Sequence, residues 1–121
     1  MTRRLDWADT DAAGYWHHST FWTYAEAGEA ELMRSLGLTG LTFGFTPRKV
    51  VSAEFLRPIY FDDEVTILFE VEAIGNTSAT YRVTLSVDGV ETARGTLTVV
   101  LTDADGKPTR WPDEARTLLE G

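Results

Sequence analysis

The spacing of apolar residues changes once along the chain, and this change is the strongest constraint on the fold. Residues 19–37 carry apolar side chains at intervals of three and four, which is the pattern of one amphipathic helix. From Val50 onward apolar and polar residues alternate, which is typical of strands that bury one face. One long helix followed by several strands predicts an α+β fold, in which the helix packs beside an antiparallel sheet.

Turn residues divide the second half of the chain into strands. After a short first strand at 3–7, we expect four long strands, at 49–58, 64–74, 77–88 and 91–102. The pair Asp88-Gly89 predicts a tight hairpin between the last two strands. Pro112 precedes a short terminal helix that we expect at about 113–119.

The long helix has a narrow apolar side. Six residues lie near one stripe: Phe21, Tyr24, Ala25, Gly28, Leu32 and Leu36. The small residues among them let a sheet approach the helix closely. Ser19 or Thr20 is expected to cap the helix start, and Gly37 its end. Residues 38–47, with their glycines and a proline, are expected to form a loop over or beside a pocket.

Composition excludes several classes of protein. The 121 residues, 43% of them hydrophobic, fit one globular domain, so we expect a single domain over 1–121. The formal net charge of -8 repels phosphate backbones, so nucleic acid is not expected as a partner. The chain has no cysteine, which excludes disulfides, thiol nucleophiles and cysteine metal sites. It shows no signal-like or long apolar stretch, so we expect a cytoplasmic protein without a membrane partner.

Residues 7–18, WADTDAAGYWHH, concentrate the groups that can carry chemistry. They place Asp9 and Asp11 before a glycine, and two histidines where the long helix begins. A carboxylate in such a place can act as a nucleophile or a general base. The unpaired N–H groups of a helix start can stabilise an oxygen that becomes negative during a reaction.

Other interpretations of these residues remain open. Asp11 can instead cap a helical turn at 12–16, because aspartate is a preferred capping residue. A zinc site at the two histidines lacks support, since no i,i+4 histidine pair or further ligand cluster accompanies them. Glu26 and Glu29 share one helix face, and we interpret them as a solvated face. Residues 103–106 resemble half a calcium loop, but the later ligands are missing.

The ordered motifs resemble a known family. They are Asp9-Thr10-Asp11, Ala12-Ala13-Gly14, Trp16-His17-His18 with the following helix, and the later stretches 51–58, 62–65 and 105–112. Together they resemble the hotdog-fold acyl-CoA thioesterases of the 4-hydroxybenzoyl-CoA thioesterase and YbgC-like type, over nearly the whole chain. The resemblance implies a long central helix wrapped by a five-stranded antiparallel sheet.

The resemblance also implies roles for individual residues. Asp11 would attack the thioester carbonyl or activate a water molecule that does. The backbone N–H of His18 would polarise the thioester oxygen, and its side chain would assist. Four residues are candidates for substrate contacts: Trp7, Gly14, Trp16 and Phe21. The substrate would be a thioester of coenzyme A or of an acyl carrier protein. No metal or organic cofactor is implied, and the family works as homodimers or homotetramers with active sites between subunits.

The chain departs from the family pattern at two places. Thr20 stands where the helix entry commonly has asparagine. The turn at 75–78 carries no positive charge, whereas some relatives bind the phosphates of coenzyme A with a basic run there. Five other cations remain as candidates for phosphate contacts: Arg48, Lys49, Arg57, Arg82 and Arg94. The uncharged turn leaves open a module that binds acyl thioesters or a partner without hydrolysis. A dehydratase is less expected, because 22–37 contains no histidine.

Overall fold

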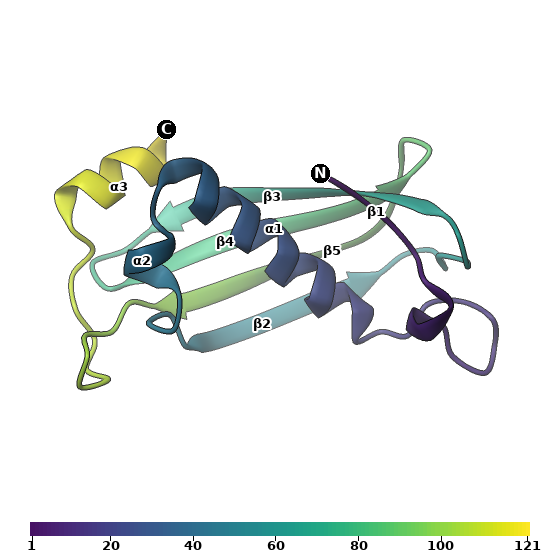
Figure 1. Cartoon of the computed structure of the whole chain (residues 1–121), viewed down its shortest axis with the longest axis horizontal. Coiled ribbons are helices and arrows are strands. Elements are labelled where there is room, and N and C mark those ends of the chain that lie inside the picture. Colours follow the sequence, from purple (N-terminus) through teal and green to yellow (C-terminus); the bar gives the residue numbers. More distant parts are fainter.

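The computed structural model describes all residues from 1 to 121. In chain order the elements are β1 (Thr2–Arg4), η1 (Trp7–Asp9), α1 (Thr20–Leu36), α2 (Thr39–Thr42), β2 (Arg48–Phe55), β3 (Glu64–Ile74), β4 (Ser78–Val87), β5 (Val90–Val100) and α3 (Asp113–Glu120). The strands form one five-stranded antiparallel sheet in the order β1-β3-β4-β5-β2 (Figure 1). The long helix α1 lies across one face of this sheet, which confirms the predicted α+β arrangement. None of the helices is both long enough and apolar enough to span a membrane.

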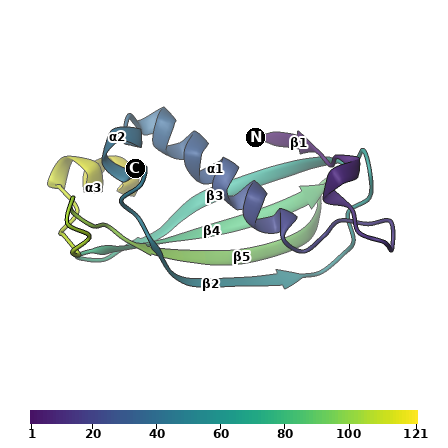
Figure 2. The ribbon, with the colours of Figure 1, turned by 60° about the horizontal axis from the view of Figure 1, so that its bottom comes forward.

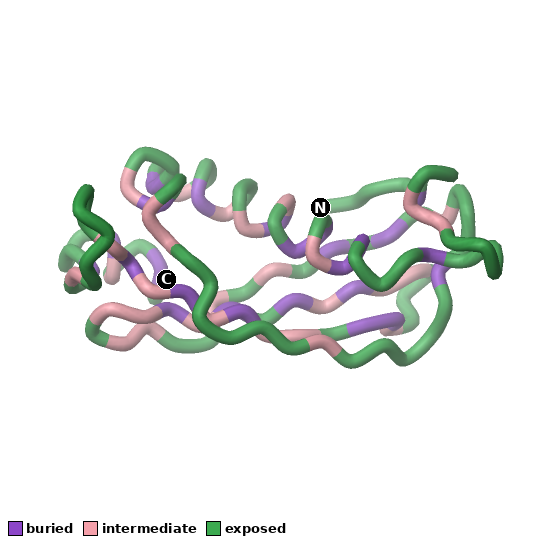
Figure 3. The backbone as a smooth tube through the Cα atoms, turned by 90° about the horizontal axis from the view of Figure 1, so that it is seen from below, coloured by how far each residue is buried: buried purple, intermediate pink, exposed green.

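The two faces of the sheet differ in chemistry. On β4, Tyr81, Val83 and Leu85 are fully buried against the helical side. The alternate residues point to the opposite face, which no helix covers (Figure 2). There, side-chain hydrogen bonds join neighbouring strands, from Ser52 to Thr96 and from Thr80 to Thr98. In Figure 3 buried residues recur along the helix and alternate with less buried ones along the strands. The predicted alternation therefore separates an apolar core from a polar outer face.

Two glycines allow α1 to approach the sheet closely. A Cβ atom at Gly28 would lie 2.9 Å from the Cβ of Phe69 on β3. A Cβ atom at Gly95 would lie 2.8 Å from the Cζ of Phe21 and 2.2 Å from the backbone oxygen of Ser52. Phe21 has no exposed surface, because its ring occupies this space over β5. The structure confirms the close approach expected at Gly28 and adds Gly95, which the sequence did not single out.

The ends of α1 are fixed in different ways. Gly37 adopts the left-handed conformation, and its N–H donates to the carbonyls of Arg34 and Met33, as expected for a helix end. Ser19 occupies the N-cap position, but its side chain makes no capping hydrogen bond to the helix. Its Oγ lies 2.7 Å from Nδ1 of His17, and the same ring nitrogen accepts the N–H of Ser19. The predicted side-chain cap by Ser19 is therefore absent, and the hydroxyl of Ser19 is engaged by the His17 ring instead.

Some predicted boundaries differ from the structure. The first strand ends at Arg4, because the chain turns at Asp6 into η1, and so the strand expected at 3–7 is wrong in its second half. The segment expected as a loop at 38–47 contains one helical turn, α2. The hairpin at Asp88 and Gly89 is confirmed, since both residues have positive φ, of 51° and 77°.

Replacing Gly28 by alanine tests the close approach of α1 to the sheet. Alanine favours helices by about 1 kcal/mol over glycine, so an unpacked helix would gain stability. We expect Gly28→Ala to lose about 1–3 kcal/mol of unfolding free energy instead, because the new methyl overlaps Phe69. Urea unfolding measures the change, with Gly40→Ala as control, since a Cβ at Gly40 would meet no atom within 4 Å. An equal gain in both variants would contradict the packing.

Candidate active site

Asp11 lies on a tight loop that folds back on itself. Thr10 pairs with Trp16 in an antiparallel bridge, and the N–H of Asp11 donates to the carbonyl of Tyr15 at 2.9 Å. Gly14 has a φ of 87°, which closes the loop and lets its N–H donate to the Asp11 carbonyl. The side chain of Asp11 accepts one hydrogen bond, at Oδ1, from the Ala13 N–H at 2.8 Å. Its other oxygen has no partner in the chain, and the residue is exposed.

Backbone hydrogen bonds fix this loop to its surroundings on both sides. The N–H of His17 donates to the carbonyl of Asp9 at 2.7 Å, which joins the start of the loop to the approach of α1. The N–H of Trp16 donates to the carbonyl of Ile59 at 2.8 Å, and Tyr15 bridges with Tyr60. The loop that carries Asp11 is therefore held between the helix start and the segment that follows β2.

The start of α1 leaves one N–H group without a partner. The N–H of Thr20 donates to the carbonyl of His17, and that of Phe21 to the carbonyl of His18. The N–H of Ser19 donates to the His17 ring at 3.1 Å. The N–H of His18 makes no hydrogen bond within the chain, and His18 is exposed. A free N–H at a helix start is a donor suited to an oxyanion.

The two histidines have different surroundings. Their rings stack, with centroids 4.4 Å apart. The His17 ring is engaged by Ser19, whereas the ring of His18 makes no hydrogen bond in the chain. No group of three or more histidine, cysteine, aspartate or glutamate side chains is arranged to hold a metal ion.

Asp9 braces the loop rather than facing solvent with Asp11. Its Oδ2 accepts the N–H of Asp6 at 3.3 Å, and its carbonyl accepts from His17 and from the Thr20 hydroxyl. Burial raises the pKa of Tyr24 to about 12, and the negative charges of Asp9 and Asp6 contribute. The phenol therefore stays protonated beneath the loop at neutral pH.

The predicted substrate contacts fall into two groups. Trp7 is 71% exposed and meets the ring of Phe61 edge-on, with centroids 5.6 Å apart. Gly14 is exposed as well. Trp16 and Phe21 are buried core residues, and both pack edge-on against Phe55. Within a single chain the rings of Trp16 and Phe21 lie behind the Asp11 loop, and little of their surface is exposed.

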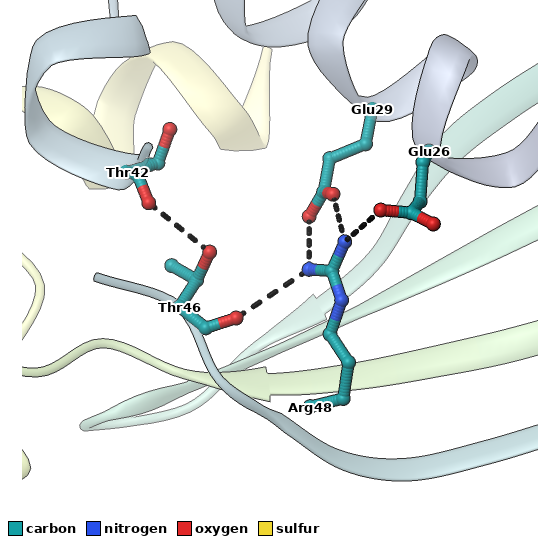
Figure 4. A network of polar contacts seen from close by, with 5 residues as sticks. All are labelled: Glu26, Glu29, Thr42, Thr46 and Arg48. Carbon is teal, nitrogen blue, oxygen red and sulfur yellow. Dashed lines mark hydrogen bonds and ion pairs between the residues drawn. The ribbon is translucent and has the colours of Figure 1, made fainter. Parts of the chain in front are cut away.

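A cavity of about 750 Å³ lies elsewhere, between α1, α2 and the start of β2, and neither Asp11 nor His18 lines it. Figure 4 shows Glu26 and Glu29 reaching from α1 toward Arg48. Arg48 donates two hydrogen bonds to Glu29, at 2.8 and 2.5 Å, and this contact raises the pKa of the guanidinium. The solvated face expected for both glutamates is wrong for Glu29, whose side chain is only 13% exposed because it pairs with Arg48, whereas Glu26 is 68% exposed.

A comparison with family models identifies the family of the chain. Residues 13–94 match the model of the Thioesterase superfamily, which is more than half of the chain. The chain belongs to the thioesterase superfamily. Its sheet and central helix are those of the hotdog fold expected from the sequence.

Individual proteins resemble the chain over different lengths. A protein of Aquifex aeolicus (strain VF5), named only as a candidate esterase, is 28% identical over 83 residues, and the match spans 65% of each chain. The structure of a predicted thioesterase from Bacillus stearothermophilus has a TM-score of 0.90 at 27% identity, covering 99% of this chain and 92% of that one. A thioesterase from Thermus thermophilus, solved with coenzyme A and zinc, has a TM-score of 0.89 at 22% identity, covering 99% of this chain and 97% of that one.

Proposed function

We propose that the protein hydrolyses acyl thioesters of coenzyme A or of an acyl carrier, with Asp11 as the catalytic carboxylate. The observation that carries this proposal is the presence of two groups without hydrogen-bond partners, one on the Asp11 loop and one where α1 begins. These groups are the unpartnered carboxylate oxygen of Asp11 and the unpartnered N–H of His18. Membership of the thioesterase superfamily supports the reaction class, and one similar fold was solved with coenzyme A.

Each free group has a defined task in the reaction. As general base, Asp11 takes a proton from water, and the resulting hydroxide adds to the thioester carbon. As nucleophile, Asp11 adds to that carbon itself and forms a mixed anhydride, which water then hydrolyses. In both routes the carbonyl oxygen becomes negative and accepts the His18 N–H, with the helix dipole adding to the effect. The carbon–sulfur bond then breaks, and the thiolate leaves and is protonated.

The remaining site residues complete the proposal. The His18 ring makes no hydrogen bond within the chain, and in this proposal it donates one to the substrate. Trp7 and Gly14 are open to the ligand, and Trp16 and Phe21 support the apolar wall with Phe55. The proposed reaction requires neither a metal nor an organic cofactor, and we place the enzyme in the cytoplasm.

Ion pairs within the chain reduce the number of cations that are free to bind the phosphates of coenzyme A. Arg48 pairs with Glu29, Arg82 with Glu72 and Arg94 with Glu54. Of the five cations that the sequence left open, only Lys49 and Arg57 form no ion pair within the chain. We therefore assign the phosphates of coenzyme A to Lys49 and Arg57.

Replacing Asp11 by asparagine tests the proposed function. The change keeps the shape of the side chain but removes the charge, so we expect kcat to fall by about 10²- to 10⁴-fold. Asp9→Asn is the matched control, because an amide oxygen still accepts the Asp6 N–H, and its activity should stay close to that of the wild type. Release of free thiol from acyl-CoA measures both rates. Full activity of a folded Asp11→Asn protein would contradict the mechanism. Tight binding of acyl-CoA without turnover by the wild type would favour a module that binds thioesters without hydrolysis.

The edge strand β2 supports assembly with a second copy of the chain. Seven of its eight residues are exposed, including Val50, Val51 and Phe55 at 53%, 50% and 45%. Val51 pairs with Leu97, so it lies on the core face of the sheet and yet is uncovered. A long apolar edge with unpaired backbone groups is a template for another strand. We propose a two-fold homodimer in which the β2 strands of the two chains pair. Whether two such dimers associate into a tetramer is a question for sedimentation analysis.

A charge on β2 tests the dimer. We expect Val51→Glu to give monomers with little activity, because pairing would bury two carboxylates at the interface. Val90→Glu is the control, since Val90 is 47% exposed but lies at the β4–β5 hairpin, away from β2. Sedimentation analysis measures the state of assembly. A wild-type monomer that is fully active would contradict the proposed dimer.

A further inference from the structure

We propose that His17 is a positioning residue for the hydrolysis of acyl thioesters. Its imidazole ring holds the N–H of Ser19, and this contact keeps the His18 N–H in the direction in which it meets the thioester oxygen. His17 does not touch the substrate, and it acts through the two residues that follow it. The inference rests on the proposed thioesterase function, because it assigns a task to the residue beside the proposed oxyanion donor.

The hydrogen bonds of the His17 ring define which of its nitrogens carries the proton. A backbone N–H can only donate, and the N–H of Ser19 donates to Nδ1 of His17 at 3.1 Å. Nδ1 therefore carries no proton, and the proton of the neutral ring is on Nε2. The Ser19 hydroxyl, whose oxygen lies 2.7 Å from Nδ1, then donates to the same nitrogen. Both polar hydrogens of Ser19 are thus held by one atom of the His17 ring.

The backbone of His17 is fixed to the Asp11 loop on one side and to α1 on the other. Its N–H donates to the carbonyl of Asp9 at 2.7 Å, and its carbonyl accepts the N–H of Thr20 at 2.9 Å. In a trans peptide the C=O and the following N–H point in opposite directions, and the chain has no cis peptide. Because the His17 carbonyl is directed at α1, the His18 N–H points away from the helix.

The next peptide, between His18 and Ser19, is fixed at both of its polar atoms. Its carbonyl accepts the N–H of Phe21 at 3.2 Å, and its N–H donates to the His17 ring. Without the ring, only the contact to Phe21 would hold this peptide, and its length is at the upper end of the usual range. The ring therefore restricts the backbone on the far side of His18. A donor that is held in place before the reaction needs no reorganisation during it.

The His17 ring also lies against the ring of His18. Their centroids are 4.4 Å apart, and their planes are inclined by 29°. Because Ser19 fixes the His17 ring, the stacking limits the orientations open to the His18 ring. His17 therefore restricts both groups of His18 that the proposed function uses, the N–H and the ring.

Three substitutions of His17 separate the hydrogen bond from the stacking. Asparagine keeps an acceptor for the N–H two residues ahead but has no ring, phenylalanine keeps a flat ring without an acceptor, and alanine keeps neither. We expect kcat with acyl-CoA to fall about tenfold in His17→Ala and in His17→Phe, because a misplaced donor acts on the transition state. KM should change less than about twofold, since ground-state binding does not depend on this donor.

Two further variants complete the kinetic comparison. His17→Asn should keep kcat within about threefold of the wild type, because its side-chain oxygen replaces Nδ1 as acceptor. Thr23→Ala is the matched control, since Thr23 is exposed in the first turn of α1 and its side chain makes no hydrogen bond. Its kcat should equal that of the wild type.

Amide hydrogen exchange measures the proposed contact directly, and it does not require turnover. We expect the Ser19 N–H to exchange about tenfold faster in His17→Ala and His17→Phe than in the wild type and His17→Asn, because its acceptor is lost. The His18 N–H, which has no partner in the chain, should exchange fast in all four proteins.

The outcomes separate this inference from the proposed function. In an active wild type, equal kcat in His17→Ala and His17→Asn, or equal exchange of the Ser19 N–H in the two variants, would overturn the inference alone. A lower unfolding free energy of His17→Ala with unchanged kcat would show a purely structural role and would also overturn it. A wild type that hydrolyses no acyl thioester would overturn the proposed function, and with it the task of His17, whatever the exchange rates.

Discussion

The close approach of α1 to the sheet is the contact on which the rest of the structure depends. It requires the missing side chains of Gly28 and Gly95, and it drives the ring of Phe21 into the space above β5. Dense packing of this kind tolerates few changes in volume. Because Phe21 is the second residue of α1 and its N–H donates to the carbonyl of His18, its burial also fixes where His18 stands relative to the sheet.

Backbone hydrogen bonds hold the Asp11 loop in a fixed position relative to this helix start. The loop is tied to the helix start through His17 and to the segment after β2 through Trp16, so its short length leaves little freedom. One carboxylate oxygen of Asp11, on the loop, and the N–H of His18, where the helix begins, have no hydrogen-bond partner in the chain. Groups held in place before the substrate binds need no reorganisation during the reaction, which is where electrostatic stabilisation is strongest.

The sequence predicted local features well and long-range pairings poorly. Periodicity located α1 and four strands, and Gly37 and Asp88-Gly89 marked their ends, because these signals act over a few residues. The family motif singled out Asp11 and His18. By contrast, no local sequence pattern predicted the pairing of Glu29 with Arg48, which are 19 positions apart, since many charged residues of the chain are potential partners. The contact of the His17 ring with Ser19 was missed because serine is a usual capping residue and was expected to bond to the helix instead.

The role of the His18 N–H as the donor to the thioester oxygen is the central claim, and two substitutions at this position test it most directly. His18→Ala removes the ring but keeps the N–H, whereas His18→Pro removes both. Because loss of one such donor lowers kcat by about 10²- to 10³-fold, we expect thiol release to be slower by about that factor in His18→Pro than in His18→Ala. Equal rates of thiol release in the two folded variants would contradict the claim.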